Sequence, residues 1–97
     1  MTYSLHPKVE SDLDEAAAHL AKHASARTVA RFLAEFERVA NLLVEHPGIG
    51  TPTSGGMRIH PFRVFKYSVV YRVVNGEPRI LIVRHKRRRA SHGAGRS

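Results

Sequence analysis

The pair Asn75–Gly76 lies between two runs rich in valine, isoleucine and tyrosine. Both residues accept positive φ, so the sequence predicts a tight β-hairpin with one strand over residues 63–74 and the next over residues 79–86. A further strand is predicted at residues 57–60 and is ended by Pro61. The stretch from residue 57 to residue 89 is therefore the sheet around which the rest of the chain must fold.

The first half of the chain carries two amphipathic patterns of helical period, over residues 7–22 and residues 26–45. Ser25 precedes the second pattern and is a predicted N-cap. The short link between the two patterns predicts an antiparallel helical hairpin, whose apolar face must be buried on the sheet. Residues 3–6 are predicted to form a short strand and residues 46–56 a loop.

These elements predict an α+β fold of order β-α-α-β-β-β, in which the helices cover a twisted antiparallel sheet of three to four strands. The 97 residues suit a single domain, 1–97, whose tail from about residue 90 is predicted to be flexible. The chain has no cysteine, which excludes disulfides and thiolate metal sites. His19 and His23 are four residues apart on a helix but lack a third ligand, so neither a metal nor a cofactor is expected. No apolar run approaches the roughly 20 residues of a membrane span, and a cytoplasmic location is predicted.

The hairpin register divides the sheet into two faces. A two-residue turn pairs Val74 with Glu77, Arg72 with Arg79, Val70 with Leu81, and Lys66 with His85. The face expected to pack on the helices carries Phe65, Tyr67, Val69, Tyr71, Val73, Ile80, Ile82 and Arg84. The opposite face has an apolar middle ringed by cations and carries Lys66, Ser68, Val70, Arg72, Arg79, Leu81, Val83 and His85. A three-residue turn would reverse one of the strands.

Positive charge is concentrated in the second half of the chain. Residues 1–45 hold five Lys/Arg against seven Asp/Glu, a net charge of −2, whereas residues 46–97 hold eleven Lys/Arg against Glu77 alone, a net charge of +10. This asymmetry predicts a polyanionic partner, either nucleic acid, a ribosome or an acidic protein, with a solvated basic surface as the alternative. The candidate binding residues are Arg58, Arg63, Lys66, Arg72, Arg84, Lys86, Arg87, Arg88 and Arg89.

His85 is the first candidate for acid–base chemistry, because an imidazole titrates near neutral pH. Arg58, Arg63, Lys66 and Arg84 are candidates for stabilising phosphoryl charge. The alternative is a structural histidine among solvated cations. Glu77 is the only acid after Glu45, which disfavours a pair of catalytic carboxylates on the sheet.

Three segments carry a resemblance to a known family: HPGIG at residues 46–50, YSVVYRV at 67–73 and IVRHKRRR at 82–89. Together with the order of elements, they resemble the RelE/ParE superfamily of toxins from bacterial type II toxin–antitoxin systems. The resemblance implies a cognate acidic antitoxin that folds on binding and forms a hetero-oligomer with the toxin.

Two mechanisms are implied by that superfamily. RelE-like members cut mRNA on the ribosome, and the position of their catalytic arginine corresponds to Ser68 here; the aromatic residue near their C-terminus is also missing. His85 matches a histidine of some ribonuclease members, which leaves a site of Lys66, Arg84 and His85 open. ParE-like members inhibit DNA gyrase, serve plasmid stabilisation and need no nuclease residues, so Ser68 favours this subgroup. A non-toxic nucleic-acid-binding module and an inactive toxin are the remaining alternatives.

Overall fold

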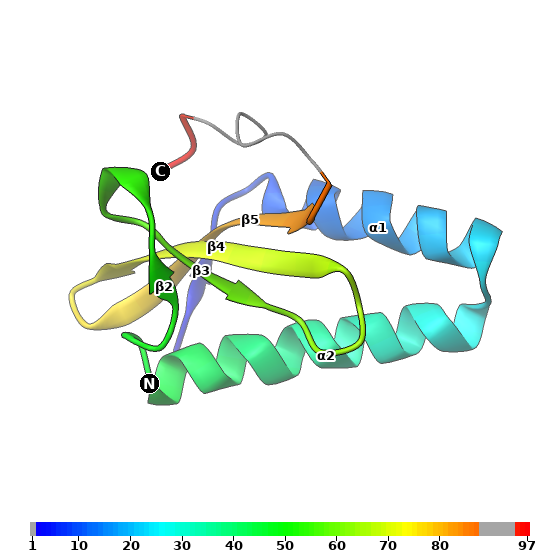
Figure 1. Cartoon of the computed structure of the whole chain (residues 1–97), viewed down its shortest axis with the longest axis horizontal. Helices are drawn as coiled ribbons and strands as arrows, with labels where there is room; N and C mark the ends of the chain where they lie inside the picture. The colour runs from blue at the N-terminus through cyan, green and yellow to red at the C-terminus, as the bar shows by residue number, and fades with distance from the viewer. Residues whose placement is uncertain (1, 88–94) are drawn as a thin grey trace.

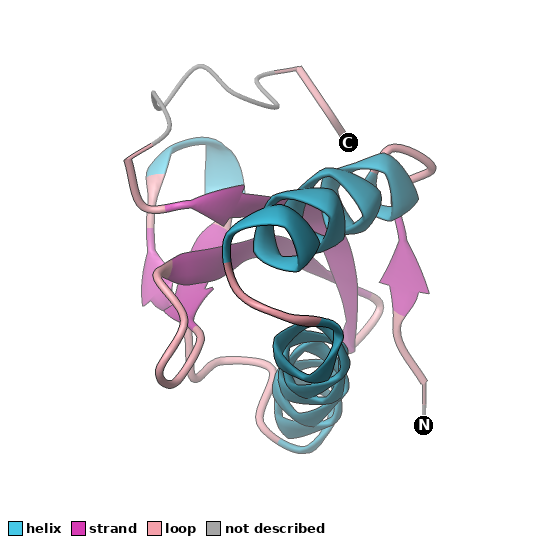
Figure 2. Ribbon diagram, turned by 90° about the vertical axis from the view of Figure 1, so that its right-hand side faces the viewer, coloured by secondary structure: helices cyan, strands magenta, loops and turns pink. Residues whose placement is uncertain are grey.

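The computed structural model describes residues 2–87 and 95–97, which form two helices packed on a mixed five-stranded sheet (Figures 1 and 2). The elements are β1 (Ser4–Leu5), α1 (Val9–His23), α2 (Ala26–Glu45), β2 (Thr51–Pro52), the short 3-10 helix η1 (Ser54–Gly56), β3 (Arg58–Pro61), β4 (Tyr67–Val74) and β5 (Glu77–His85). The predicted α+β fold is confirmed. The sheet order is β1-β5-β4-β3-β2, with β1 parallel to β5 and the other pairs antiparallel. The sheet is thus mixed, and β2 adds a strand inside the predicted loop.

The helical hairpin follows from local chain chemistry. The Ser25 hydroxyl accepts a hydrogen bond from the backbone N–H of Thr28 at 3.1 Å and caps α2, as predicted. The apolar stripe of α2, which includes the fully buried Phe32 and Leu43, packs on the sheet. Within the described part of the chain, no helix combines the length and the apolar character that a membrane crossing requires.

The β4–β5 hairpin turns at Asn75 and Gly76, with φ of 53° and 81° respectively. Close to the turn the predicted pairing is confirmed, since Val74 pairs with Glu77 and Arg72 with Arg79. A β-bulge then changes the register, because Tyr71 pairs with Ile80 but Val70 pairs with Ile82, so that Leu81 is the extra residue. The predicted pairs Val70–Leu81 and Lys66–His85 are therefore wrong, and Tyr67 is the partner of His85.

The bulge also corrects the predicted faces of β5. Ile80 packs against the helices as predicted, but beyond the bulge Val83 takes this position and Ile82 lies on the other face. An extra residue in a strand of period two exchanges the faces of every residue after it. His85 consequently lies on the helix side, with its ring 5.1 Å from that of Tyr67.

The predicted strand over residues 63–74 is wrong in its first four residues, because β4 begins only at Tyr67. Residues 63–66 form a turn instead. The turn allows both Phe62 and Phe65 to pack against Phe32 of α2. In an extended strand these two residues, three positions apart, would point to opposite faces of the sheet.

Tyr71 fixes the loop that follows α2 to the sheet. Its hydroxyl donates a hydrogen bond to the Pro47 carbonyl at 2.7 Å and accepts one from the Gly50 N–H at 2.9 Å. The Arg58 guanidinium donates to the carbonyls of Gly48 and Gly50 at 3.2 and 2.8 Å. Burial raises the pKa of the fully buried Tyr71 hydroxyl.

Candidate functional site: the basic end of the sheet

The predicted binding cations fall at opposite ends of β4 and β5. Arg58 and Arg72 lie toward the loop and η1, where the Arg72 guanidinium donates to the Gly55 carbonyl at 3.1 Å. Both side chains thus contact loop backbone, and Arg72 Nε is buried without a hydrogen-bond partner in the described chain. Arg88 and Arg89 lie outside the described residues.

The remaining cations gather where β4 begins and β5 ends, at the right of Figure 1. We call this cluster the basic end, and it consists of Arg63, Lys66, Arg84, Lys86 and Arg87. Backbone pairing holds it together, because Lys86 N–H donates to the Lys66 carbonyl at 2.9 Å and Arg84 pairs with Ser68. Four of its five side chains are exposed and Arg84 is half-buried. A cluster of this kind attracts polyanions through its field.

A cavity of about 630 Å³ adjoins the basic end, between α1 and the last residues of β5. Its lining combines cations, carboxylates and imidazoles: Asp12, Glu15, Ala16, His19, Tyr67, Val83, Arg84, His85 and Arg87. Arg84, His85 and Arg87 were predicted site residues, whereas Asp12 and Glu15 were not, and His19 was considered only as a metal ligand. The spacing of Asp12 and Ala16, one helical turn apart on the buried side of α1, was the available signal.

His85 is held in place by its neighbours. The backbone N–H of Arg87 donates to His85 Nδ1 at 3.1 Å, and the edge of the ring meets Tyr67 at an interplanar angle of 83°. An imidazole whose Nδ1 already accepts a hydrogen bond can take up a substrate proton there only by losing that bond. This geometry suits a positioned histidine better than a general base.

Glu35 of α2 is hydrogen-bonded to the backbone of the basic end at Arg63. Its carboxylate accepts two hydrogen bonds from Arg38, at 2.7 and 2.8 Å, and one from the backbone N–H of Arg63 at 2.6 Å. The bonds from Arg38 and then Arg63 lower the pKa of Glu35. Burial, together with the charges of Arg38 and Arg63, lowers the pKa of the nearby His60.

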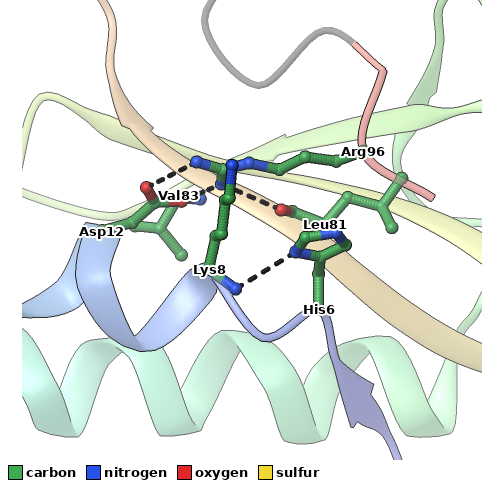
Figure 3. A network of polar contacts seen from close by, with 6 residues as sticks. All are labelled: His6, Lys8, Asp12, Leu81, Val83 and Arg96. Atoms are coloured by element: carbon green, nitrogen blue, oxygen red, sulfur yellow. Dashed lines mark hydrogen bonds and ion pairs between the residues drawn. The ribbon is translucent and has the colours of Figure 1, made fainter.

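The outer edge of β5 is closed by a buried ion pair (Figure 3). Arg96 contacts both carboxylate oxygens of Asp12, at 2.6 and 3.2 Å, and donates to the Leu81 carbonyl at 3.2 Å. Asp12 also accepts a hydrogen bond from the Val83 N–H at 3.1 Å. The pair therefore satisfies one backbone group of the bulge residue Leu81 and one of Val83, where β1 no longer covers the strand. Burial and the charge of Arg96 lower the pKa of the adjacent His6.

Residues 3–90 match the family model described as "ParE toxin of type II toxin-antitoxin system, parDE". The chain belongs to the ParE toxin family. The predicted resemblance to the superfamily, and the preference for its ParE-like subgroup, are thereby confirmed. No curated protein matches the sequence.

The ParE fold is also seen in a solved structure titled "Chromosomal ParDE TA system from P. aeruginosa". It shares 22% sequence identity with this chain, covers 88% of this chain and 95% of its own, and superposes with a TM-score of 0.77. At this identity the likeness shows a common fold. In this ParE chain, position 68 holds a serine that is 5% exposed and built into the β4–β5 ladder. Within the residues described, no three His, Asp or Glu side chains are arranged to hold a metal ion.

Proposed function

We propose that this toxin arrests bacterial growth by inhibiting DNA gyrase in the cytoplasm, and that a cognate acidic ParD antitoxin neutralises it. The observation that carries the proposal is the burial of Ser68 in a member of the ParE family. The resemblance to the RelE/ParE superfamily implies an arginine at this position in a RelE-like ribonuclease. A short buried hydroxyl cannot stabilise phosphoryl charge as a guanidinium does.

The basic end supports this proposal as the contact surface for the target. Arg63, Lys66, Lys86 and Arg87 are exposed, while the nearby carboxylate of Glu35 is already hydrogen-bonded to Arg38. Gyrase works on DNA, and exposed cations are suited to a protein–DNA complex, where they attract phosphate groups. The Arg58 and Arg72 side chains donate hydrogen bonds to backbone carbonyls of residues 48–55. We therefore expect their substitution to lower the stability of the fold more than it weakens target binding.

The proposal is tested with purified, antitoxin-free toxin in a gyrase supercoiling assay run beside mRNA cleavage on programmed ribosomes. We expect supercoiling to be inhibited and the mRNA to stay intact. Lys66→Gln and Arg87→Gln should each weaken inhibition, whereas the control Arg31→Gln, on an exposed position of α2, should not. Cut mRNA with unimpaired supercoiling would overturn the proposal.

The second candidate function is a ribosome-dependent endoribonuclease, and it is favoured by one observation. The cavity brings His85 and Arg84 together with Glu15 and His19, a set that can supply acid–base groups and a cation near one phosphate. Lys66 would join this site from the turn that precedes β4. Codon-periodic mRNA cuts that disappear in His85→Ala would establish this function in place of gyrase inhibition.

A further inference from the structure

Val64 has a backbone conformation that its side chain disfavours. Its φ is 71°, in the left-handed region, and its side chain is 87% exposed. A β-branched residue rarely adopts positive φ, because its Cβ substituents crowd the backbone. Strain of this kind persists only where the surrounding structure enforces it, and it is found mostly at functional sites.

The contacts on both sides of Val64 enforce the turn. The Phe65 N–H donates to the Arg63 carbonyl at 2.7 Å, which closes a three-residue turn centred on Val64. The rings of Phe62 and Phe65 lie 5.3 and 5.4 Å from the Phe32 ring, so each flank is anchored in the core. Glu35 fixes the Arg63 N–H as described above.

These contacts explain why the chain turns at position 64, but they do not explain why the residue there is a valine. Glycine at position 64 would allow the same phenylalanine packing without steric strain, and asparagine would tolerate it. Valine instead presents a branched apolar side chain to solvent at a conformational cost. The fold gains nothing from that side chain, since it is almost fully exposed.

Exposed cations lie near Val64 in the chain. Arg63 directly precedes it and Lys66 follows two residues later, and the exposed Lys86 is hydrogen-bonded through its backbone to Lys66. An apolar contact surrounded by charged groups is the usual arrangement at the centre of a protein–protein interface. We call residues 63–66 the Val64 turn.

We infer that the Val64 turn is a preformed recognition element, whose Val64 side chain enters a small apolar hollow in an acidic, folded surface of the toxin's target protein. This inference rests on the proposed function and names the gyrase protein as the partner. A valine side chain has no aromatic face with which to stack on bases, which favours protein over nucleic acid. A rigid turn loses little entropy on binding a surface of fixed shape, and therefore suits a folded target.

The first test replaces Val64 while keeping the turn. In Val64→Asn the side chain becomes polar but still tolerates positive φ. We expect unchanged or higher thermal stability, unchanged ParD binding and about tenfold weaker inhibition of gyrase and of growth, as for loss of one interface anchor. Val74→Asn is the matched control, because Val74 is also an exposed valine, 43% accessible, at the far end of β4. Full gyrase inhibition by Val64→Asn would overturn the inference.

The second test identifies the partner and uses the absence of cysteine from the sequence. Val64→Cys gives a single thiol that can carry a benzophenone photo-crosslinker, and the labelled toxin is irradiated with purified gyrase and DNA, and separately with ParD. A crosslink to a gyrase subunit supports the inference, whereas crosslinks to DNA alone or to ParD alone contradict it.

The two proposals fail in different ways. If the wild-type toxin arrests growth without inhibiting gyrase, the proposed function is wrong and the gyrase partner falls with it. If the wild type inhibits gyrase and Val64→Asn inhibits equally, only the Val64 turn is excluded as the contact.

Discussion

The hydroxyl oxygen of Tyr71 lies where a side chain at position 50 would have to be. It accepts the Gly50 N–H at 2.9 Å, and a Cβ built on Gly50 would lie 2.6 Å from it. The close approach of this backbone to the buried phenol therefore requires glycine.

Gly50→Ala is expected to destabilise the protein by about 1–3 kcal/mol, because the buried Tyr71 ring cannot move away without disturbing the core. Denaturant unfolding measures this loss. Gly48→Ala is the matched control, since nothing lies within 4 Å of a Cβ at Gly48 and its stability should be nearly unchanged. Equal losses in both variants would contradict the steric explanation.

Tyr71→Phe is expected to lower the free energy of unfolding by about 1–3 kcal/mol at neutral pH, because the Pro47 carbonyl and the Gly50 N–H lose a buried partner. The pKa of Tyr71 is raised from 10.0 in the folded protein. Its contribution is therefore complete below pH 10 and is lost as the pH rises through the folded pKa. The variant should show a flatter alkaline decline in stability than the wild type, with Tyr3→Phe as the control.

Glu35→Gln is expected to cost about 1 kcal/mol at neutral pH, because Arg38 and the Arg63 N–H lose a charged acceptor. The pKa of Glu35 is lowered from 4.5, first by Arg38 and then by the Arg63 N–H, so its contribution is present above pH 4.5 and is lost as the pH falls through the folded pKa. Thermal unfolding followed from neutral to acidic pH should therefore show a smaller acid loss in the variant. Glu37→Gln, at an exposed position of the same helix, is the matched control.

Arg96→Gln is expected to destabilise the fold by about 3 kcal/mol, because the Asp12 carboxylate, only 3% exposed, loses its ion pair with Arg96. Asp12→Asn should cost a similar amount. The double variant should lose clearly less than the sum of the two, which denaturant unfolding of all four proteins measures as a coupling energy. Additive losses would mean that Asp12 and Arg96 do not stabilise each other. The control is Asp14→Asn, at an exposed position of α1.

Much of this fold could be predicted because local chemistry determines it. Asn75 and Gly76 accept the positive φ that the hairpin needs, and Ser25 caps α2. The bulge could not be predicted, since Leu81 lies in an unbroken apolar run in which no alternation marks the extra residue. That single residue moved Val83 and His85 to the helix side.

The candidate site was predictable in its charge but not in its shape. Arg63, Lys66 and Arg84 were predicted from the distribution of charge along the sequence. The carboxylates of Asp12 and Glu15 reach the cavity only through the packing of α1 beside β5. The positive φ of Val64 could not be predicted either, because valine favours a strand. The packing of the neighbouring Phe65 on Phe32 overrides that preference.

The pairing of Asp12 with Arg96 has a consequence for the growing polypeptide. The two residues are 84 positions apart, so the ribosome releases α1 long before the arginine that neutralises its carboxylate. Until then, the outer edge of β5 beyond β1 lacks a partner for the Leu81 carbonyl. Translation products that stop before residue 96 should accordingly leave a strand edge open, and be cleared by proteases or aggregate sooner than the chain that contains Arg96.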